Sequence, residues 1–427
     1  MMDHVAPALP EKNRGWTVTF AGLGINLALG ILYSWSVIGK QIPKEWKWDE
    51  TDKSWPYMVA CLIFSLMMVP AGRMQDRLGP RLVAGIGGLL VGAGMILASF
   101  TTTPLGYILG FGVLAGTGIG FGYASATPPA VKWFPKAKTG LIAGLVVSGF
   151  GLSGVYAAPL TKWLIETQGL PHTIMFLGIG FLTVVLILSQ LLVAPPPGYV
   201  PSVPAGTAVP PASGRREDYA PTQILGTWQF YLLWFMYFCG AGAGLMYISK
   251  AATIALEQAD IKLGFILVAI LAIGNGAGRI LAGILSDKIG RKATMALCFT
   301  LQAILLSTLS LVTPGSFLAR PVVMGVLSAL IGANYGANLA LFPSVMKDFY
   351  GLKNFGVNYG LVFTAWGAGG FALPLLAGMV HDGTIQPHWR GSFVFAYYCA
   401  VGLLVVAALV TFILKPPRHP EDAPARA

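Results

Sequence analysis

The chain has 427 residues, of which 55% are hydrophobic and only 11% are charged, and its mean hydropathy is +0.69. A soluble protein carries charge on about 25% of its residues. The composition therefore excludes a soluble protein and predicts an all-α integral membrane protein in contact with the lipid bilayer. The net charge of +11 does not indicate nucleic-acid binding, because the basic residues fall in loops between apolar segments, where membrane topology explains them.

Apolar runs of 18 or more residues predict twelve transmembrane helices in two sets of six. The first set lies within residues 1–194 and the second within 223–427, as two six-helix halves. Residues 195–222 are rich in Pro, Gly, Ser and Ala, and predict a flexible linker between the halves. The spans are expected near 16–39, 55–74, 81–101, 105–129, 140–163, 173–194, 227–249, 263–285, 293–313, 317–342, 356–380 and 391–414.

Lys and Arg are distributed unevenly over the loops. Six spans before the linker and six after it place both termini and the linker on one side of the membrane, and that side carries twice as many Lys and Arg as the other. Because positive residues favour the cytoplasmic side, the sequence predicts cytoplasmic termini and a cytoplasmic linker. The expected location is a plasma membrane of the bacterial inner-membrane type.

Two sequence patterns occur once in each half. GRMQDRLGPR at 72–81 follows the second span, and GILSDKIGRK at 283–292 follows the eighth. The spaced glycines of 144–154 recur, in the same order, at 360–370. Parallel repeats of this kind build carriers whose binding site lies between the halves, near the middle of the bilayer.

The eighth span carries one full charge, Arg279, in its interior. It precedes Asp287 by eight residues, or roughly 12 Å of helix, so it lies well inside a hydrocarbon layer about 30 Å thick. A guanidinium keeps its proton in a protein, and placing it in the membrane costs roughly 2.5–3.5 kcal/mol on insertion scales. A bound anion would compensate for that cost.

The loop GRMQDRLGPR and its echo after the eighth span resemble the signature of the major facilitator superfamily. The resemblance covers the whole chain and implies transport by alternating access. By this resemblance Asp76, Arg77, Asp287 and Arg291 act in gating and conformational switching. The alternative is that these charges serve only to fix the topology.

A narrower resemblance comes from motifs that follow one another along the chain, together with the lone Arg of the eighth span. They resemble the monocarboxylate transporter family, especially its bacterial branch of lactate transporters and oxalate–formate exchangers. The motifs are Tyr33-Ser34-Trp35, Tyr123 ahead of Trp133-Phe134-Pro135, Leu341-Phe342-Pro343 and Asn358-Tyr359-Gly360-Leu361.

Three departures from that family bear on the substrate. Oxalate exchangers carry a Lys in the eleventh span, where this chain has Trp366, and animal carriers have a Lys in the first span, where this chain has Val37. Animal carriers also place an Asp four residues before the Arg, where this chain has Asn275. The spans are thus expected to hold one fixed positive charge and no fixed negative charge, which favours one carboxylate over a dianion such as oxalate.

Arg279 is predicted to bind the carboxylate through its two-pronged donor geometry, and Asn275, one turn away, to add a neutral hydrogen bond. The alternatives are a structural Arg at a helix break near the neighbouring glycines, and an Asn that joins helices. Tyr33 and Trp35 could belong to an interfacial aromatic belt. Further candidates are the polar side chains of Tyr123, Tyr335, Asn334 and Asn338, and an apolar sub-pocket of Leu27, Leu145, Tyr359, Phe363 and Trp366.

The route of a coupled proton is open. Without an acid in the core, the proton could ride on the substrate carboxylate beside Arg279. Peripheral candidates near the span ends are Glu257, Asp260, His381 and Asp382, although a histidine at such a position is also expected to sit in water.

The sequence thus predicts a monomeric, proton-coupled symporter of small monocarboxylates, L-lactate or pyruvate-like, that needs no cofactor or metal. One alternative is an anion exchanger of the oxalate–formate type, and another is a membrane carboxylate receptor that transports nothing. An enzyme is not expected, because the five histidines lie near span ends or in tails and neither HExxH nor GxSxG occurs.

Overall fold

The fold was obtained as a computed structural model that describes residues 13–135, 139–196, 199, 219–351 and 354–417. In this part of the chain twelve helical segments are long and apolar enough to span a membrane, which confirms the predicted class. The predicted linker, 195–222, lies largely outside the described residues.

The first six spans contain eight α-helices, because the first and fourth spans are each composed of several segments. α1, a 3₁₀ turn and α2 form the first span, and α5, a π-helix and α6 form the fourth. The segments are α1 (Gly15–Leu29), the 3₁₀ turn (Gly30–Ser34), α2 (Trp35–Lys40), α3 (Glu50–Leu78), α4 (Pro80–Ser99), α5 (Pro104–Tyr107), the π-helix (Ile108–Ala115), α6 (Gly116–Lys132), α7 (Thr139–Gln168) and α8 (Leu170–Ser189).

The last six spans follow a short helix, α9 (Pro221–Leu225). Each of them is one uninterrupted α-helix. They are α10 (Trp228–Glu257), α11 (Gly264–Ile289), α12 (Arg291–Leu309), α13 (Pro321–Tyr350), α14 (Phe355–His381) and α15 (Val394–Ile413).

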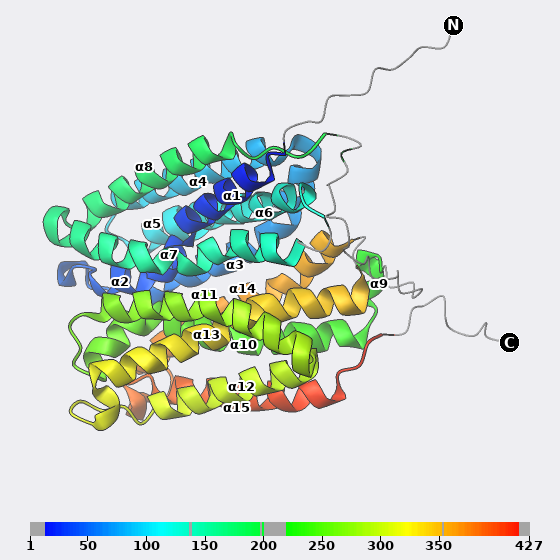
Figure 1. Cartoon of the computed structure of the whole chain (residues 1–427). Helices are drawn as coiled ribbons and strands as arrows, with labels where there is room; N and C mark the ends of the chain where they lie inside the picture. The colour runs from blue at the N-terminus through cyan, green and yellow to red at the C-terminus, as the bar shows by residue number, and fades with distance from the viewer. Residues whose placement is uncertain (1–12, 136–138, 197–198, 200–218, 352–353, 418–427) are drawn as a thin grey trace, which may run out of the picture.

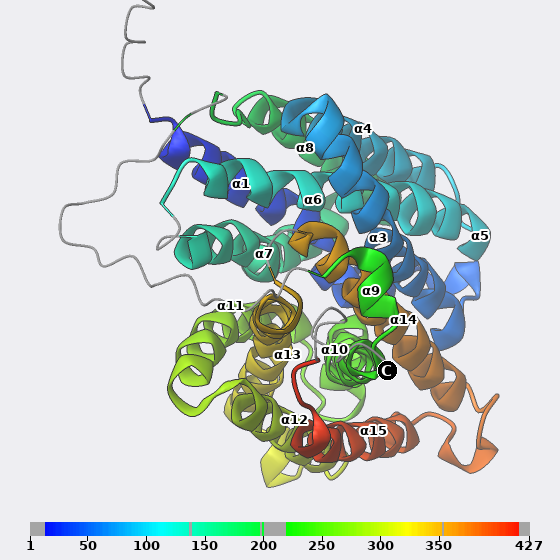
Figure 2. The ribbon, with the colours of Figure 1, turned by 90° about the vertical axis from the view of Figure 1, so that its right-hand side faces the viewer.

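The two sets of helices lie side by side, with the α1–α8 set above the α10–α15 set in Figure 1. The start of α1 and the end of α15 lie on one face, the right-hand side of Figure 1, which we call the terminal face; Figure 2 looks onto it. The other end of the bundle is called the opposite face. Between the sets, α3 packs against α14 and α7 packs against α11. These two contacts frame the interface in which a substrate site was predicted.

Several helices extend beyond the apolar runs. α3 begins at Glu50 because Asp49 caps it: the Asp49 carboxylate accepts the Asp52 N–H at 2.7 Å, and the Asp52 carboxylate accepts the Asp49 N–H at 3.4 Å. α10 continues to Glu257, well past the predicted end near 249. Hydrophobicity alone misses such turns because they lie where the helix approaches water. Both extensions carry charged residues that meet at the opposite face.

Candidate functional site

Arg279 lies in α11 and reaches across to α7 in the other half. Its side chain is buried, with 8% of its surface exposed. Its Nη1 donates to the backbone carbonyl of Val147 at 2.8 Å, and its Nε donates to Asn275 Oδ1 at 3.2 Å. Among the described residues, Arg279 has no acidic partner within ion-pair distance. Between the halves there is therefore a buried cation with no counter-ion in the described part of the chain.

Two hydrogen-bond donors at this place are buried without an acceptor. They are Nη2 of Arg279 and Nδ2 of Asn275. A buried donor that makes no hydrogen bond costs about 1–3 kcal/mol, and more when it is charged. A carboxylate has two oxygens that accept hydrogen bonds and one negative charge. The chemistry of the site therefore fits one carboxylate group.

Glycines bring the backbones of α11 and α13 into contact around Arg279. A Cβ at Gly278 would lie 2.0 Å from the Ala333 carbonyl oxygen, and one at Gly336 would lie 2.1 Å from the Asn275 carbonyl oxygen. Gly274 and Gly332 are equally close to the facing helix. Small residues of this spacing let membrane helices pack closely. The glycines beside Arg279 thus serve helix packing, and α11 is not broken there.

Gly151 of α7 provides the space opposite the guanidinium. A Cβ at this position would lie 3.0 Å from Arg279 Nη2. Because Gly151 has no side chain, the buried and unpartnered Nη2 is not crowded on that side. Gly151 belongs to the glycine pattern that the sequence repeats in both halves.

A chain of three hydrogen-bonded aromatic residues connects the two halves. Trp366 Nε1 donates to Tyr335 Oη at 2.8 Å, and Tyr335 Oη lies 2.6 Å from Tyr33 Oη. Tyr33 lies in the 3₁₀ turn that interrupts the first span. Tyr33 and Trp35 are each 1% exposed, so the interpretation of these two residues as an interfacial belt is wrong.

The 3₁₀ turn is contacted by a side chain of the facing helix α7. The Ser153 hydroxyl of α7 donates to the Gly30 carbonyl at 2.6 Å, and a Cβ at Gly30 would collide with Ser153. The Ser153 hydroxyl therefore competes with the backbone N–H groups of the first span for the Gly30 carbonyl. The result places the Tyr33 hydroxyl in the interface.

Tyr123 and Phe363 extend this aromatic group. Their rings stack across the halves at 6.3 Å and 22°, and Phe363 stacks on Trp366 at 5.1 Å and 12°. Phe64 and Phe150, which were not predicted from the sequence, pack edge-on against Tyr123 at 5.3 Å and 5.4 Å. Apolar spacing alone could not select them, because buried aromatics occur throughout the spans.

Four other predicted residues remain, and one of them, Tyr359, packs against Phe363 with ring centroids 5.6 Å apart. Asn338 donates to the Asn334 carbonyl at 3.0 Å and faces α10 at Gly240, and Tyr359 shares a hydrogen bond of 3.3 Å with Tyr237. Leu27 and Leu145 are half-buried. The structure places Arg279 against Asn275, and it joins Tyr123, Phe363, Trp366 and Tyr335 in one aromatic group. The part of Asn338, Tyr359, Leu27 and Leu145 in a pocket stays a prediction.

Of the predicted gating residues, the structure describes ion pairs for Arg291 and Asp287 but not for Asp76 and Arg77. Arg291 contacts Asp287 at 2.7 Å and Asp348 at 3.0 Å, and all three belong to the second half. Arg77 is exposed, and the side chain of Asp76 lies outside the described residues. The observed ion pairs join α11, α12 and α13 at the terminal face.

Three of the four peripheral acid–base candidates lie together at the opposite face. His381 Nε2 lies 3.0 Å from Glu257 Oε2, and His381 Nδ1 lies 3.7 Å from Asp382 Oδ1. Asp260 is exposed in the α10–α11 loop, with a left-handed backbone at φ 53°, and takes no part in this cluster.

The expectation of a single charge buried in the spans is wrong. Lys250 of α10 and Glu50 of α3 are 3% and 7% exposed, and their side chains form an ion pair of 2.7 Å. The sequence pattern places both in loops because they lie beyond the apolar runs. Because the two residues are 200 positions apart, nothing in the sequence near either one indicates that they pair.

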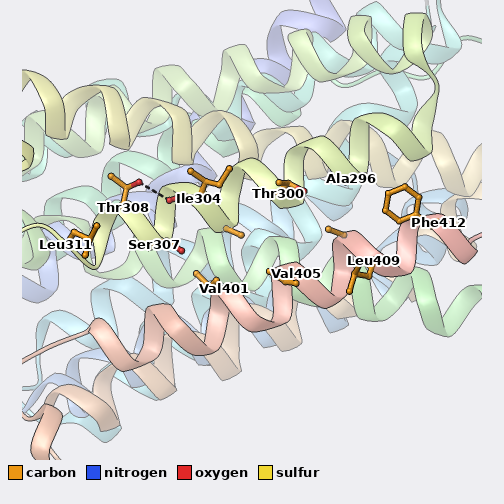
Figure 3. Close-up of a pocket in the computed structure, with 12 residues that line it drawn as sticks. Ala296, Thr300, Ile304, Ser307, Thr308, Leu311, Val401, Val405, Leu409 and Phe412 are labelled. Atoms are coloured by element: carbon orange, nitrogen blue, oxygen red, sulfur yellow. Dashed lines mark hydrogen bonds between the residues drawn. The ribbon is translucent and has the colours of Figure 1, made fainter.

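A groove of about 530 Å³ between α12 and α15 is a different feature. Figure 3 shows the side chains that line this groove on the two helices. Its lining is apolar apart from Thr300, Ser307 and Thr308, and it contains no charged residue. A carboxylate would find no cation there, so this groove does not rival Arg279 as an anion site.

Comparison with known proteins agrees with this architecture. The sequence profile of the Major Facilitator Superfamily matches residues 15–266 and 253–427. The chain is a multi-pass membrane transporter, and it belongs to the major facilitator superfamily. This family consists of transporters, not enzymes.

Relatives within the family are distant but match along most of their length. The chain is 26% identical to the oxalate:formate antiporter of Oxalobacter formigenes, over 94% of this chain and 92% of that protein. It is 26% identical to human monocarboxylate transporter 11, over 97% and 86%. It is 27% identical to the uncharacterized MFS-type transporter YhjX of Escherichia coli, over 86% and 88%.

A solved structure shows the same fold. It is a bacterial homologue of the human lysosomal transporter Spinster, in an inward-facing and unoccupied conformation. The TM-score is 0.65 at 16% sequence identity, and the match covers 95% of this chain and 98% of that one.

Proposed function

We propose that this chain transports small monocarboxylates, with Arg279 as the residue that binds the carboxylate. The observation that carries the proposal is the buried guanidinium with an unpartnered Nη2, beside an unpartnered Asn275 Nδ2. Arg279 belongs to α11 and its guanidinium contacts α7, so an anion bound to it lies beside both halves. A substrate that neutralises the charge there lowers the electrostatic cost of moving the halves past each other.

The number of charges supports one carboxylate rather than two. Trp366 occupies the position where the oxalate exchangers are expected to carry a second cation, and it donates its N–H to Tyr335. A monoanion such as L-lactate or pyruvate leaves the site neutral when bound to Arg279. Tyr123, Phe363 and Trp366 form the wall that faces the short carbon chain.

The carrier is proposed to work as a proton symporter in a plasma membrane of the bacterial inner-membrane type, as a monomer with cytoplasmic termini. The proton travels with the substrate carboxylate or through the cluster of His381 and Glu257. Burial raises the pKa of the Asp382 carboxyl, but contacts with His381, Thr51 and two backbone N–H groups outweigh burial and hold that pKa below its usual range. Asp382 therefore stays ionised near neutral pH in this conformation.

Uptake of labelled L-lactate into proteoliposomes tests the proposal. We expect uptake that rises with an inward proton gradient and falls to background in Arg279→Ala. The matched control is Arg320→Ala, which removes an exposed arginine in the α12–α13 loop. Gradient-driven uptake by Arg279→Ala equal to that of the control would contradict the site assignment.

Exchange is the second candidate, favoured by the antiporter relative from Oxalobacter formigenes. An exchanger would take up label only when the vesicles are loaded with unlabelled substrate, and it would not respond to the proton gradient. Binding of the carboxylate without any flux in either experiment would indicate the receptor alternative.

A further inference from the structure

A buried ion pair joins the two halves at the opposite face. Lys250 of α10 donates to Glu50 Oε2 at 2.7 Å and to the Glu50 backbone carbonyl at 2.9 Å. The second carboxylate oxygen of Glu50 accepts from Lys53 at 2.7 Å. Glu50 is thus fully engaged, and separating the halves here would leave Lys250 without a partner in a poorly solvated place.

Asp382 makes a second, independent connection between the halves. It lies just after α14, and its carboxylate accepts the backbone N–H groups of Glu50 at 3.0 Å and Thr51 at 2.6 Å, as well as the Thr51 hydroxyl. These N–H groups belong to the first turn of α3, where no intrahelical acceptor exists. A carboxylate at a helix N-terminus is also favoured by the helix dipole.

On its other side, Asp382 faces His381, whose Nδ1 lies 3.7 Å from Asp382 Oδ1 and whose Nε2 contacts Glu257 at 3.0 Å. His381 and Glu257 both belong to the second half, and His381 lies between the two carboxylates. Gly378, one turn before Asp382, lets α14 approach α3 closely, because a Cβ there would lie 2.9 Å from Ser54 Oγ. A weaker bond of 3.4 Å joins Lys40 to the Ala252 carbonyl.

The polar contacts between the halves are confined to two levels among the described residues. One level is the middle of the bundle, with Arg279–Val147 and Tyr33–Tyr335. The other is the opposite face, with the Glu50, Asp382 and Lys40 contacts above. We infer that Glu50, Lys250 and Asp382 form a lock that keeps the carrier closed at the opposite face and must break for substrate to enter there.

Cys61 is a native reporter for this lock. It lies on α3 eleven residues after Glu50, or roughly 16 Å along the helix, and is completely buried. It packs against α14, since a Cβ at Gly370 would lie 2.9 Å from Cys61 Cβ. Opening the opposite face exposes this contact to water. Replacing Cys239, Cys298 and Cys399 by Ala leaves Cys61 as the only thiol.

The experiment measures labelling of Cys61 by a membrane-impermeant maleimide, applied separately to intact cells and to inverted membrane vesicles. We expect Lys250→Met and Asp382→Asn to label at least tenfold faster than the parent from the opposite face, with no such increase from the terminal face. The matched control is Lys262→Met, an exposed lysine on the same face, which should label at the parent rate.

A double-mutant cycle separates the ion pair from general loosening. Either single substitution, Glu50→Gln or Lys250→Met, already removes the Lys250–Glu50 ion pair. The double variant should therefore label Cys61 no faster than the faster of the two single variants. The lock would be overturned if Cys61 labelled at the same rate in Lys250→Met, Asp382→Asn and Lys262→Met. It would also be overturned if labelling became equally faster from both faces. Should Lys250→Met not fold, as judged by size-exclusion chromatography, Asp382→Asn carries the same test. The readout needs no substrate, so it is independent of the proposed transport of monocarboxylates.

Discussion

Arg279 has two engaged donor groups and one free one. Its position in an apolar span made it predictable as an anion site, because a permanent charge there needs compensation. Its neighbours on α7 were not predictable: the Val147 carbonyl and Gly151 come from a helix more than a hundred residues earlier in the chain. The role of Tyr33 was missed for a related reason, since nothing local to 30–34 reveals that Ser153 interrupts the helix there.

Gly151 tests the space beside the guanidinium. Gly151→Ala adds a methyl group 3.0 Å from Arg279 Nη2, so we expect it to weaken substrate binding at least tenfold, or about 1.4 kcal/mol. Gly144→Ala on the same helix is the control, because a Cβ there meets nothing within 4 Å. Equal affinity of the two variants in a binding assay would refute this role of Gly151.

Asn275 tests the charge of the site. Asn275→Asp keeps the shape but places a carboxylate next to Arg279 Nε, where it competes with the substrate for the cation. We expect it to reduce lactate affinity much more than Asn275→Ala, which removes one neutral hydrogen bond worth about 0.5–1.5 kcal/mol. Titration of both purified variants with lactate compares the two affinities. Tighter lactate binding by Asn275→Asp than by Asn275→Ala would be incompatible with an anion site.

At the scale of elements, the sequence predicted each span but not its irregularities. The fourth span contains a π-helix at Ile108–Ala115, beside a close crossing of Gly94 and Gly110. The first span contains the 3₁₀ turn with Tyr33. The hydrophobic pattern does not predict such changes of helix type, because they depend on which groups of a neighbouring helix are within reach.

The α11–α13 crossing is predicted to be sensitive to a single methyl group. Gly278→Ala places a Cβ 2.0 Å from a backbone carbonyl, which forces the helices apart and costs about 1–3 kcal/mol. Thermal unfolding in detergent should show a lower Tm together with weaker substrate binding, because Arg279 is displaced. Gly283→Ala on the same helix meets nothing within 4 Å and should behave like the parent; indistinguishable melting curves would contradict the crossing.

At the scale of the whole molecule, the repeated loops and glycine patterns indicate two halves from the amino-acid sequence alone. They do not indicate which residues hold the halves together. Glu50 and Lys250 are distant in sequence, and each belongs to a helix that extends beyond its apolar run. The charge distribution that predicts the topology therefore places both in loops, although they are among the most buried charged residues described.

The lock should respond to acid only at low pH. The pKa of Asp382 is held below its usual value, so its contribution is fully present above about pH 4 and is lost as the pH falls through the lowered value. The charged groups around it are His381, Glu257 and Asp52. Labelling of Cys61, normalised to denatured protein at each pH, should be constant from pH 5 to 6, below the ordinary pKa of about 6.5 of the neighbouring histidine His381; a rise as the pH falls from 6 to 5 would contradict this assignment.

The central claim is that Arg279 binds one carboxylate. Equilibrium binding of labelled L-lactate to the purified protein, with Arg279→Ala and the exposed control Arg320→Ala in parallel, tests it most directly. We expect a Kd raised at least tenfold in Arg279→Ala alone, and displacement of the label from the parent by pyruvate more readily than by oxalate. Unchanged lactate affinity in Arg279→Ala would contradict the claim.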